Sequence, residues 1–75
     1  MSAVKAWGLD VQEAQERGRA AAGTADLCAR MGAFRDLCAE LGEVANGYAC
    51  PLTAARALVG EAARAFVAEL KGVGA

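Results

Sequence analysis

The feature that most constrains this chain is a stripe of apolar residues through its middle, spaced alternately by four and three positions. Such spacings place side chains on one face of an α-helix. We therefore predict a helix over about residues 25–45, whose apolar face must be covered by another helix. The stripe consists of Leu27, Met31, Phe34, Cys38, Leu41, Ala45 and Tyr48, widened by Leu37 and Val44.

A weaker helical pattern precedes this stripe. Asp10 and Glu13 have the spacing of a capping box, which predicts a helix start at Val11. Gly23 followed by Thr24 predicts an end near residue 22 and a new N-cap. Because its apolar residues are small, this helix over about 11–22 buries little area and either covers the others loosely or continues into the next helix. Those residues are Val11, Ala14, Gly18, Ala21 and Ala22.

A third helix is predicted after the segment "EVANGYACP". Asn46 and Gly47 tolerate the left-handed conformation of a C-cap, and Pro51 suits a first helical turn. The helix is expected to run over about 51–71, with a stop at Gly72. Its predicted apolar face contains Leu52, Ala55, Val59, Ala62 or Ala63, Phe66 and Leu70.

A second row along the middle helix consists almost wholly of small residues. A glycine in a helix interior costs roughly 1 kcal/mol relative to alanine, so its presence needs a reason. We expect a neighbouring backbone to approach closely along this row. The row contains Ala21, Ala25, Cys28, Gly32, Arg35, Ala39 and Gly42.

These patterns predict an all-α fold in one small domain over residues 1–75. The short linker before Pro51 makes the last two helices an antiparallel hairpin, with a weaker N-terminal helix. Either the three helices form a complete bundle, or the hairpin is closed by self-association or by a partner. Large side chains are few and isoleucine is absent, so we favour the second alternative.

The three cysteines do not have the spacing of a bonded set. On one helix, Cys28 and Cys38 lie roughly 15 Å apart along the axis, too far for a disulfide. There is no histidine and no C-x-x-C motif, so no zinc site is expected. We interpret Cys28 and Cys38 as small packing residues. Cys50 precedes Pro51 at a helix N-terminus, where the dipole favours a thiolate, and is a possible reactive thiol.

Charge and composition exclude several classes of function. A net charge of −1 without a basic run gives no footprint for nucleic acid. No apolar run is long enough to span a membrane, and the N-terminus does not resemble an export signal, so we expect a cytoplasmic protein. Abundant Ala, Arg and Gly suggest a bacterial source. Without a histidine general base or a phosphate-binding loop, we expect no enzyme activity, no catalytic residue, no metal and no cofactor.

Three acidic residues crowd one side of the middle helix, namely Asp36, Glu40 and Glu43. Their simplest interpretation is a solvated face. They could instead meet arginines of a partner, or Arg17 and Arg19 of the first helix.

The predicted function is that of a non-enzymatic interaction module, an adaptor-like or chaperone-like helical protein. Its partner is another protein or a second copy of the chain, and we favour a homodimer. The turn "GYACP" between two amphipathic helices is similar to the hairpin turn of small chaperones that assist type III secretion needle subunits. The alternative is a redox or regulatory protein that uses Cys50. Trp7, before the first cap, is predicted to be a lid on the hairpin or an anchor for a partner. The predicted docking residues are Leu27, Met31, Phe34, Leu41, Val59, Phe66 and Leu70, with Trp7 and Tyr48.

Overall fold

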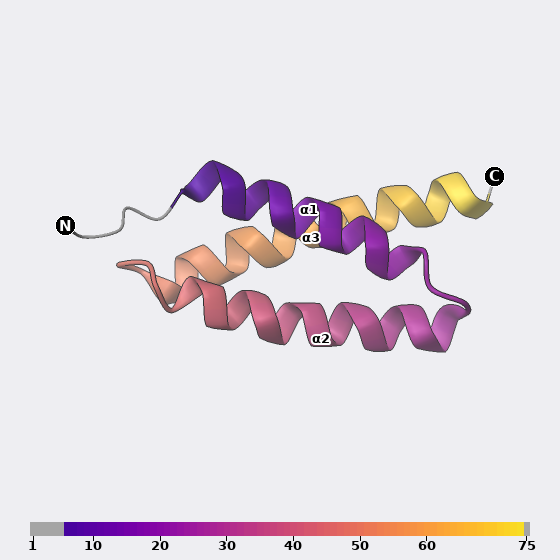
Figure 1. Cartoon of the computed structure of the whole chain (residues 1–75), viewed down its shortest axis with the longest axis horizontal. Helices are drawn as coiled ribbons and strands as arrows, with labels where there is room; N and C mark the ends of the chain where they lie inside the picture. Colours follow the sequence, from indigo (N-terminus) through magenta and orange to yellow (C-terminus); the bar gives the residue numbers. More distant parts are fainter. Residues whose placement is uncertain (1–5, 75) are drawn as a thin grey trace.

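The computed structural model describes residues 6–74, and the side chains of residues 6–72. It contains three helices: α1 (Trp7–Ala22), α2 (Leu27–Ala45) and α3 (Pro51–Gly74). No strand occurs within residues 6–74. The helices form an elongated up-down-up bundle in which α2 runs antiparallel to α1 and α3 (Figure 1). The predicted all-α class is confirmed, and its three-helix alternative is the observed one.

Helix α1 begins at Trp7, four residues before the predicted start. Its N-cap, Ala6, makes no side-chain capping hydrogen bond. Asp10 lies in the first turn, where its carboxylate accepts a hydrogen bond from the Tyr48 hydroxyl. The predicted capping box with Glu13 is therefore wrong, because the Asp10 side chain is engaged by the α2–α3 turn.

The helices α1 and α2 are separate, joined by residues 23–26. Gly23 is the C-cap of α1, as predicted. Thr24 is not the N-cap of α2, because its hydroxyl donates back to the Ala21 carbonyl, 3.0 Å away. The N-cap is Asp26, whose carboxylate accepts from the Ala29 amide at 2.9 Å. The start of α2 therefore moves from residue 25 to Leu27.

The expectation that α1 is a loosely attached helix is wrong. Its most extensive packing is against α3, and Ala14, Gly18, Ala21 and Ala22 are all buried. A Cβ atom added to Gly18 would collide with the carbonyl oxygen of Ala62 and lie 3.1 Å from the Ala62 Cα. The close approach of backbones predicted along α2 therefore occurs between α1 and α3. At Gly32 and Gly42 an added Cβ would meet nothing within 4 Å.

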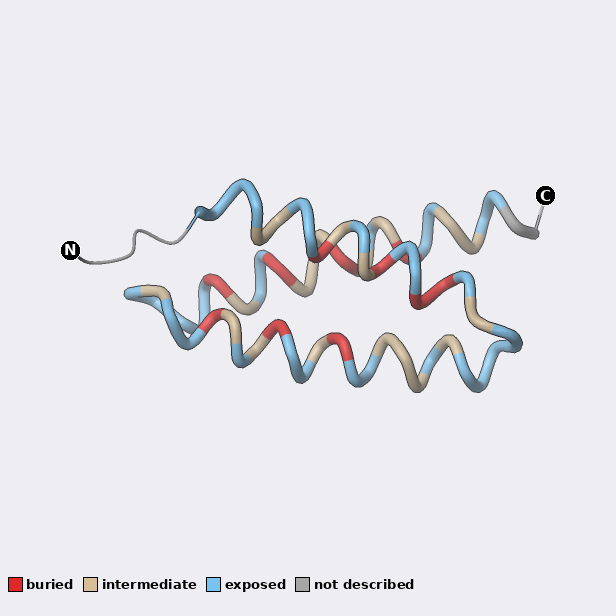
Figure 2. Tube along the Cα trace, viewed as in Figure 1, coloured by how far each residue is buried: buried red, intermediate tan, exposed pale blue. Residues whose placement is uncertain are grey.

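The core lies along the middle of the bundle, where buried segments of all three helices face one another (Figure 2). One cluster contains Ala14, Leu37, Leu41, Leu58 and Ala62. A second contains Ala21, Ala22 and Phe66. The ring of Phe34 packs on that of Phe66, with centroids 4.8 Å apart. This ring pair marks where α2 meets α3.

The buried row of α3 differs by one position from the predicted one at its N-terminal end. Leu58 is fully buried, whereas Leu52 is 72% exposed. The shift arises because α3 packs against α1 as well as against α2. Small residues such as Gly18 allow α1 and α3 to lie close together. The buried row is Ala54, Leu58, Ala62 and Phe66.

The turn between α2 and α3 does not use a left-handed residue. Asn46 has φ −62°, and no described glycine has positive φ. Instead, the amides of Asn46, Gly47 and Tyr48 bond three residues back, at 3.2, 3.1 and 3.0 Å. Pro51 begins α3 as predicted, but α3 continues past Gly72 to Gly74.

Candidate functional site

Four large apolar side chains are exposed on α2 and α3. Leu52, in the first turn of α3, is 72% exposed, and the other three are Leu27 at 64%, Met31 at 53% and Val67 at 46%. Leu27 and Met31 lie in the first turns of α2, and Val67 lies near the end of α3. Because the two helices are antiparallel, these residues lie toward the same end of the bundle (Figure 1). We call this set the α2/α3 edge.

Five other predicted docking residues pack within the chain. Leu41 and Phe66 are buried in the core, so the folded chain does not offer them to a partner. Phe34, Val59 and Leu70 are half-buried and pack against the two core clusters. The sequence pattern missed this because it treated α1 as too weak to contribute to the core.

Next to Val67 lies a hollow of about 500 Å³ on the outer side of α3. Ala63, Val67 and Ala68 supply its apolar lining, and Arg64 and Lys71 border it. Arg64 donates a hydrogen bond to Glu61, with a nitrogen–oxygen distance of 2.5 Å. No acidic residue lines this hollow. Glu61 therefore balances the charge of Arg64, and Lys71 is the second cation beside the hollow.

A second hollow, of about 340 Å³, lies at the opposite end, beside the α2–α3 turn. Trp7 stands edge-on to Tyr48, with ring centroids 5.1 Å apart and planes at 90°. Trp7 belongs to the first turn of α1 rather than to a preceding segment, and it remains 39% exposed. It therefore covers Tyr48 and still presents part of its ring outward. Cys50, Thr53 and Ala54 also line this hollow.

The environment of Tyr48 disfavours its ionised form. Burial of the phenol, the hydrogen bond to Asp10 and the negative charge of that carboxylate together raise the pKa of Tyr48 to about 12. The neutral phenol is therefore retained at any physiological pH. It keeps the α2–α3 turn attached to α1.

The three cysteines are free. Cys28 is exposed, so its prediction as a packing residue is wrong; helix α2 presents that side to solvent. Cys38 is partly buried, and this burial raises the pKa of its thiol. Cys50 is exposed at the start of α3. Within the described part of the chain, no group of three or more Cys, Asp or Glu side chains could hold a metal ion.

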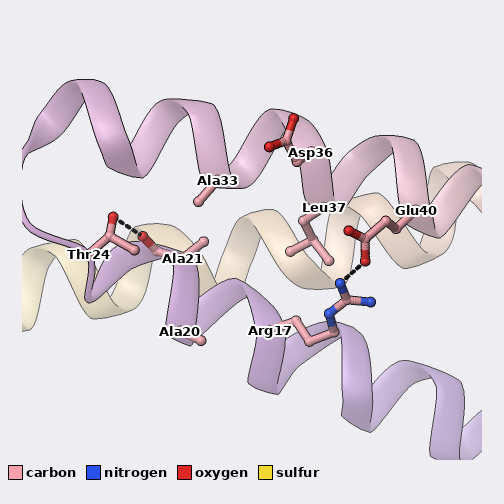
Figure 3. A pocket seen from close by; sticks show the side chains of 8 residues that line it. All are labelled: Arg17, Ala20, Ala21, Thr24, Ala33, Asp36, Leu37 and Glu40. Carbon is pink, nitrogen blue, oxygen red and sulfur yellow. Dashed lines mark hydrogen bonds and ion pairs between the residues drawn. The ribbon is translucent and has the colours of Figure 1, made fainter.

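A third hollow, of about 360 Å³, lies between α1 and α2 (Figure 3). Arg17 of α1 forms an ion pair with Glu40 of α2 across it. This ion pair matches, at Arg17, the alternative in which the acidic side of α2 meets the first helix, while the Glu40 side chain stays 54% exposed. Asp36 instead lies 3.5 Å from its neighbour Arg35, and both are largely exposed. Ala20, Ala21, Ala33 and Leu37 supply its apolar lining.

Comparison of the chain with protein-family models, with curated proteins and with solved structures finds no match. None of the helices within residues 6–74 is long and apolar enough to cross a bilayer. Functional inference therefore rests on the surface of the bundle itself.

Proposed function

We propose that this chain is a non-enzymatic helical interaction module that binds another protein through the α2/α3 edge. The exposure of Leu27, Met31 and Val67 is the observation that supports it. About half of each side chain is open to solvent, so covering each one contributes on the order of 1 kcal/mol. An adaptor or small chaperone in a bacterial cytoplasm is the setting that we favour.

The proposed edge is narrower than the faces expected from the sequence. Leu41 and Phe66 fill the core, so a partner contacts the rim of the α2–α3 packing and not its centre. Self-association through this rim is the first alternative partner, and it can be measured directly.

Photo-crosslinking tests the proposal. A photoreactive amino acid replaces Met31 in the full chain, and in a matched variant it replaces Arg19, which is exposed on α1. We expect one discrete crosslinked product from position 31 in cells that express the chain, and none from position 19. Light scattering across a dilution series shows whether that product is a second copy. Equal crosslinking from both positions, or none from either, would contradict the proposal.

The second candidate function is that of a thiol-dependent protein that uses Cys50. It is favoured by the exposure of Cys50 in the hollow beside Trp7. Cys28 is a matched control within the chain because it is also exposed and free. Native alkylation followed by mass spectrometry compares the two. A Cys50 that reacts no faster than Cys28 removes this candidate.

A further inference from the structure

The hollow beside the α2–α3 turn has two aromatic walls. Trp7, from the first turn of α1, and Tyr48, from the α2–α3 turn, both line this space of about 340 Å³. Its volume is close to the smallest that is typical of ligand pockets, so the hollow suits a small molecule. The other lining residues are small, namely Ala49, Cys50, Thr53, Ala54 and Ala57.

The rings of Trp7 and Tyr48 meet at a right angle. Their planes are 90° apart, and their centroids are separated by 5.1 Å. A group in the corner between two such rings can lie within about 6 Å of both centroids, the distance over which the face of an aromatic ring attracts a cation. Aromatic walls of this kind recognise methylated ammonium groups, because the methyl groups pack on the rings and the ring faces attract the charge.

Asp10 places a negative charge next to these rings. Its carboxylate accepts the hydrogen bond from the Tyr48 hydroxyl, and because that phenol is neutral, the charge of the carboxylate stays uncompensated. Among residues 6–72, Asp10 forms no ion pair. The same charge acts on the ring, since it contributes to the raised pKa of Tyr48. Of the residues that the structure describes, no lysine or arginine lines the hollow. The site therefore favours a cation over an anion.

We infer that the hollow lined by Trp7 and Tyr48 binds a small compound that carries a trimethylammonium group. The rings supply the apolar and cation-attracting surface, and Asp10 supplies the counter-charge. The trimethylammonium group occurs in free solutes such as choline and in the headgroup of phosphatidylcholine. This site is independent of the α2/α3 edge, which lies at the opposite end of the bundle (Figure 1).

Other ligands fit this hollow less well. A neutral apolar group covers the same surface but leaves the negative charge of Asp10 without a counter-charge. A primary ammonium group has the charge but is compact and strongly hydrated, so it loses more on leaving water and has no methyl groups to pack on the rings. An anion is repelled by Asp10. These three comparisons define the experiment.

The test is a titration of the isotope-labelled full chain by two-dimensional nitrogen–proton NMR. The probe is choline, and its neutral isostere is the alcohol in which a tert-butyl group replaces the trimethylammonium group. Ethanolamine supplies the primary ammonium. We expect choline to shift the indole N–H of Trp7 and the amides of Cys50 and Thr53. Choline should bind roughly tenfold more tightly than the neutral alcohol, and also more tightly than ethanolamine.

Vesicles distinguish the two sources of the group. Sedimentation of the chain with phosphatidylcholine vesicles, and its release by free choline, would identify the lipid headgroup as the ligand. Binding of choline without sedimentation would identify a free solute. Phosphatidylglycerol vesicles, which lack the trimethylammonium group, are the control and should not sediment the chain.

The matched variants are Asp10→Asn and Asp36→Asn, which change the net charge equally. Asp10→Asn keeps an acceptor for the Tyr48 hydroxyl but removes the charge, so choline should bind roughly two- to fivefold more weakly. Asp36 is largely exposed beside the hollow between α1 and α2, and its variant should bind as the parent chain does. In a third variant, Trp7→Leu keeps apolar surface without a ring and should remove the preference for choline over the neutral alcohol. Circular dichroism checks that all three remain helical.

The inference would be overturned by equal affinities for choline and the neutral alcohol, or by the absence of a saturable shift with choline. Equal binding of choline by Asp10→Asn and Asp36→Asn would also overturn it, as would shifts confined to residues near Val67. Crosslinking from position 31 is unaffected by any of these results, so a failure here leaves the proposed function standing.

Discussion

The hydroxyl of Tyr48 donates a hydrogen bond to the carboxylate of Asp10, which joins the first turn of α1 to the turn between α2 and α3. These residues are 38 positions apart in the sequence. The bond closes one end of the bundle, where the only tyrosine and the only tryptophan of the chain meet. The effect of this hydrogen bond on stability can be measured by titrating the Tyr48 phenol.

The first prediction concerns alkaline pH. Because the folded chain raises the pKa of Tyr48 from 10.0 to about 12, its neutral form is favoured in the folded state. This contribution to stability is complete below pH 10 and is lost as the pH rises to about 12. Tyrosinate absorbance near 295 nm follows the single phenol directly.

The Asp10→Asn variant is the control for this titration. Removing the carboxylate charge lowers the pKa of Tyr48 only part of the way toward 10, because burial, the largest cause, remains. An unchanged midpoint in Asp10→Asn would show that the carboxylate does not act on the phenol.

The second prediction concerns the glycines. Gly18→Ala places a methyl group against the Ala62 carbonyl, so we expect a loss of roughly 1–3 kcal/mol from backbone displacement. Gly32→Ala and Gly42→Ala enter open space in a helix interior and should each stabilise the chain by roughly 0.5–1 kcal/mol. Urea unfolding followed by circular dichroism measures all three. A neutral Gly18→Ala would mean that α1 and α3 do not touch there.

The third prediction tests the register of α3. Leu58→Ala removes a fully buried side chain and should cost about 2–5 kcal/mol. Leu52→Ala, in the same helix, changes an exposed side chain and should cost less than about 0.5 kcal/mol. Equal losses in the free energy of unfolding for the two variants would instead support the register of α3 expected from the sequence.

The fourth prediction concerns the start of α2. Asp26→Ala removes the acceptor for the Ala29 amide and should cost about 1 kcal/mol. Thr24→Ala is the matched change in the same loop and should cost less, because its hydroxyl bonds only the Ala21 carbonyl at the end of α1. A larger loss at Thr24 would identify Thr24 as the cap instead. Thermal unfolding of the two variants distinguishes these outcomes.

Local patterns were sufficient to predict some element boundaries. Gly23 ends α1 and Pro51 begins α3 as the sequence indicated, because the turn preferences of glycine and proline act locally. The Asp10 capping box failed because a side chain 38 residues away engages the carboxylate. Capping patterns do not record such competition between distant groups.

Packing was harder to predict than helix bounds. A row of small residues shows that another backbone can approach, but it does not show which helix approaches. The close approach occurs at Gly18 of α1, against the Ala62 backbone of α3. The exposed Leu27 and Met31 belong to the predicted docking stripe, whereas Leu41, on the same stripe, is buried. Whether a stripe residue is covered depends on how closely the neighbouring helices pack along it, and spacing along one helix does not contain that information.

The pairing of Trp7 with Tyr48 has a consequence for spectroscopy. Both intrinsic fluorophores lie at the end of the bundle that holds the α2–α3 turn, and their rings are close enough for excitation energy to pass from phenol to indole. Emission from this protein therefore reports on that end alone. Binding at Leu27 or Val67 would not change the emission of Trp7. A fluorescent reporter for that end of the bundle therefore has to be introduced.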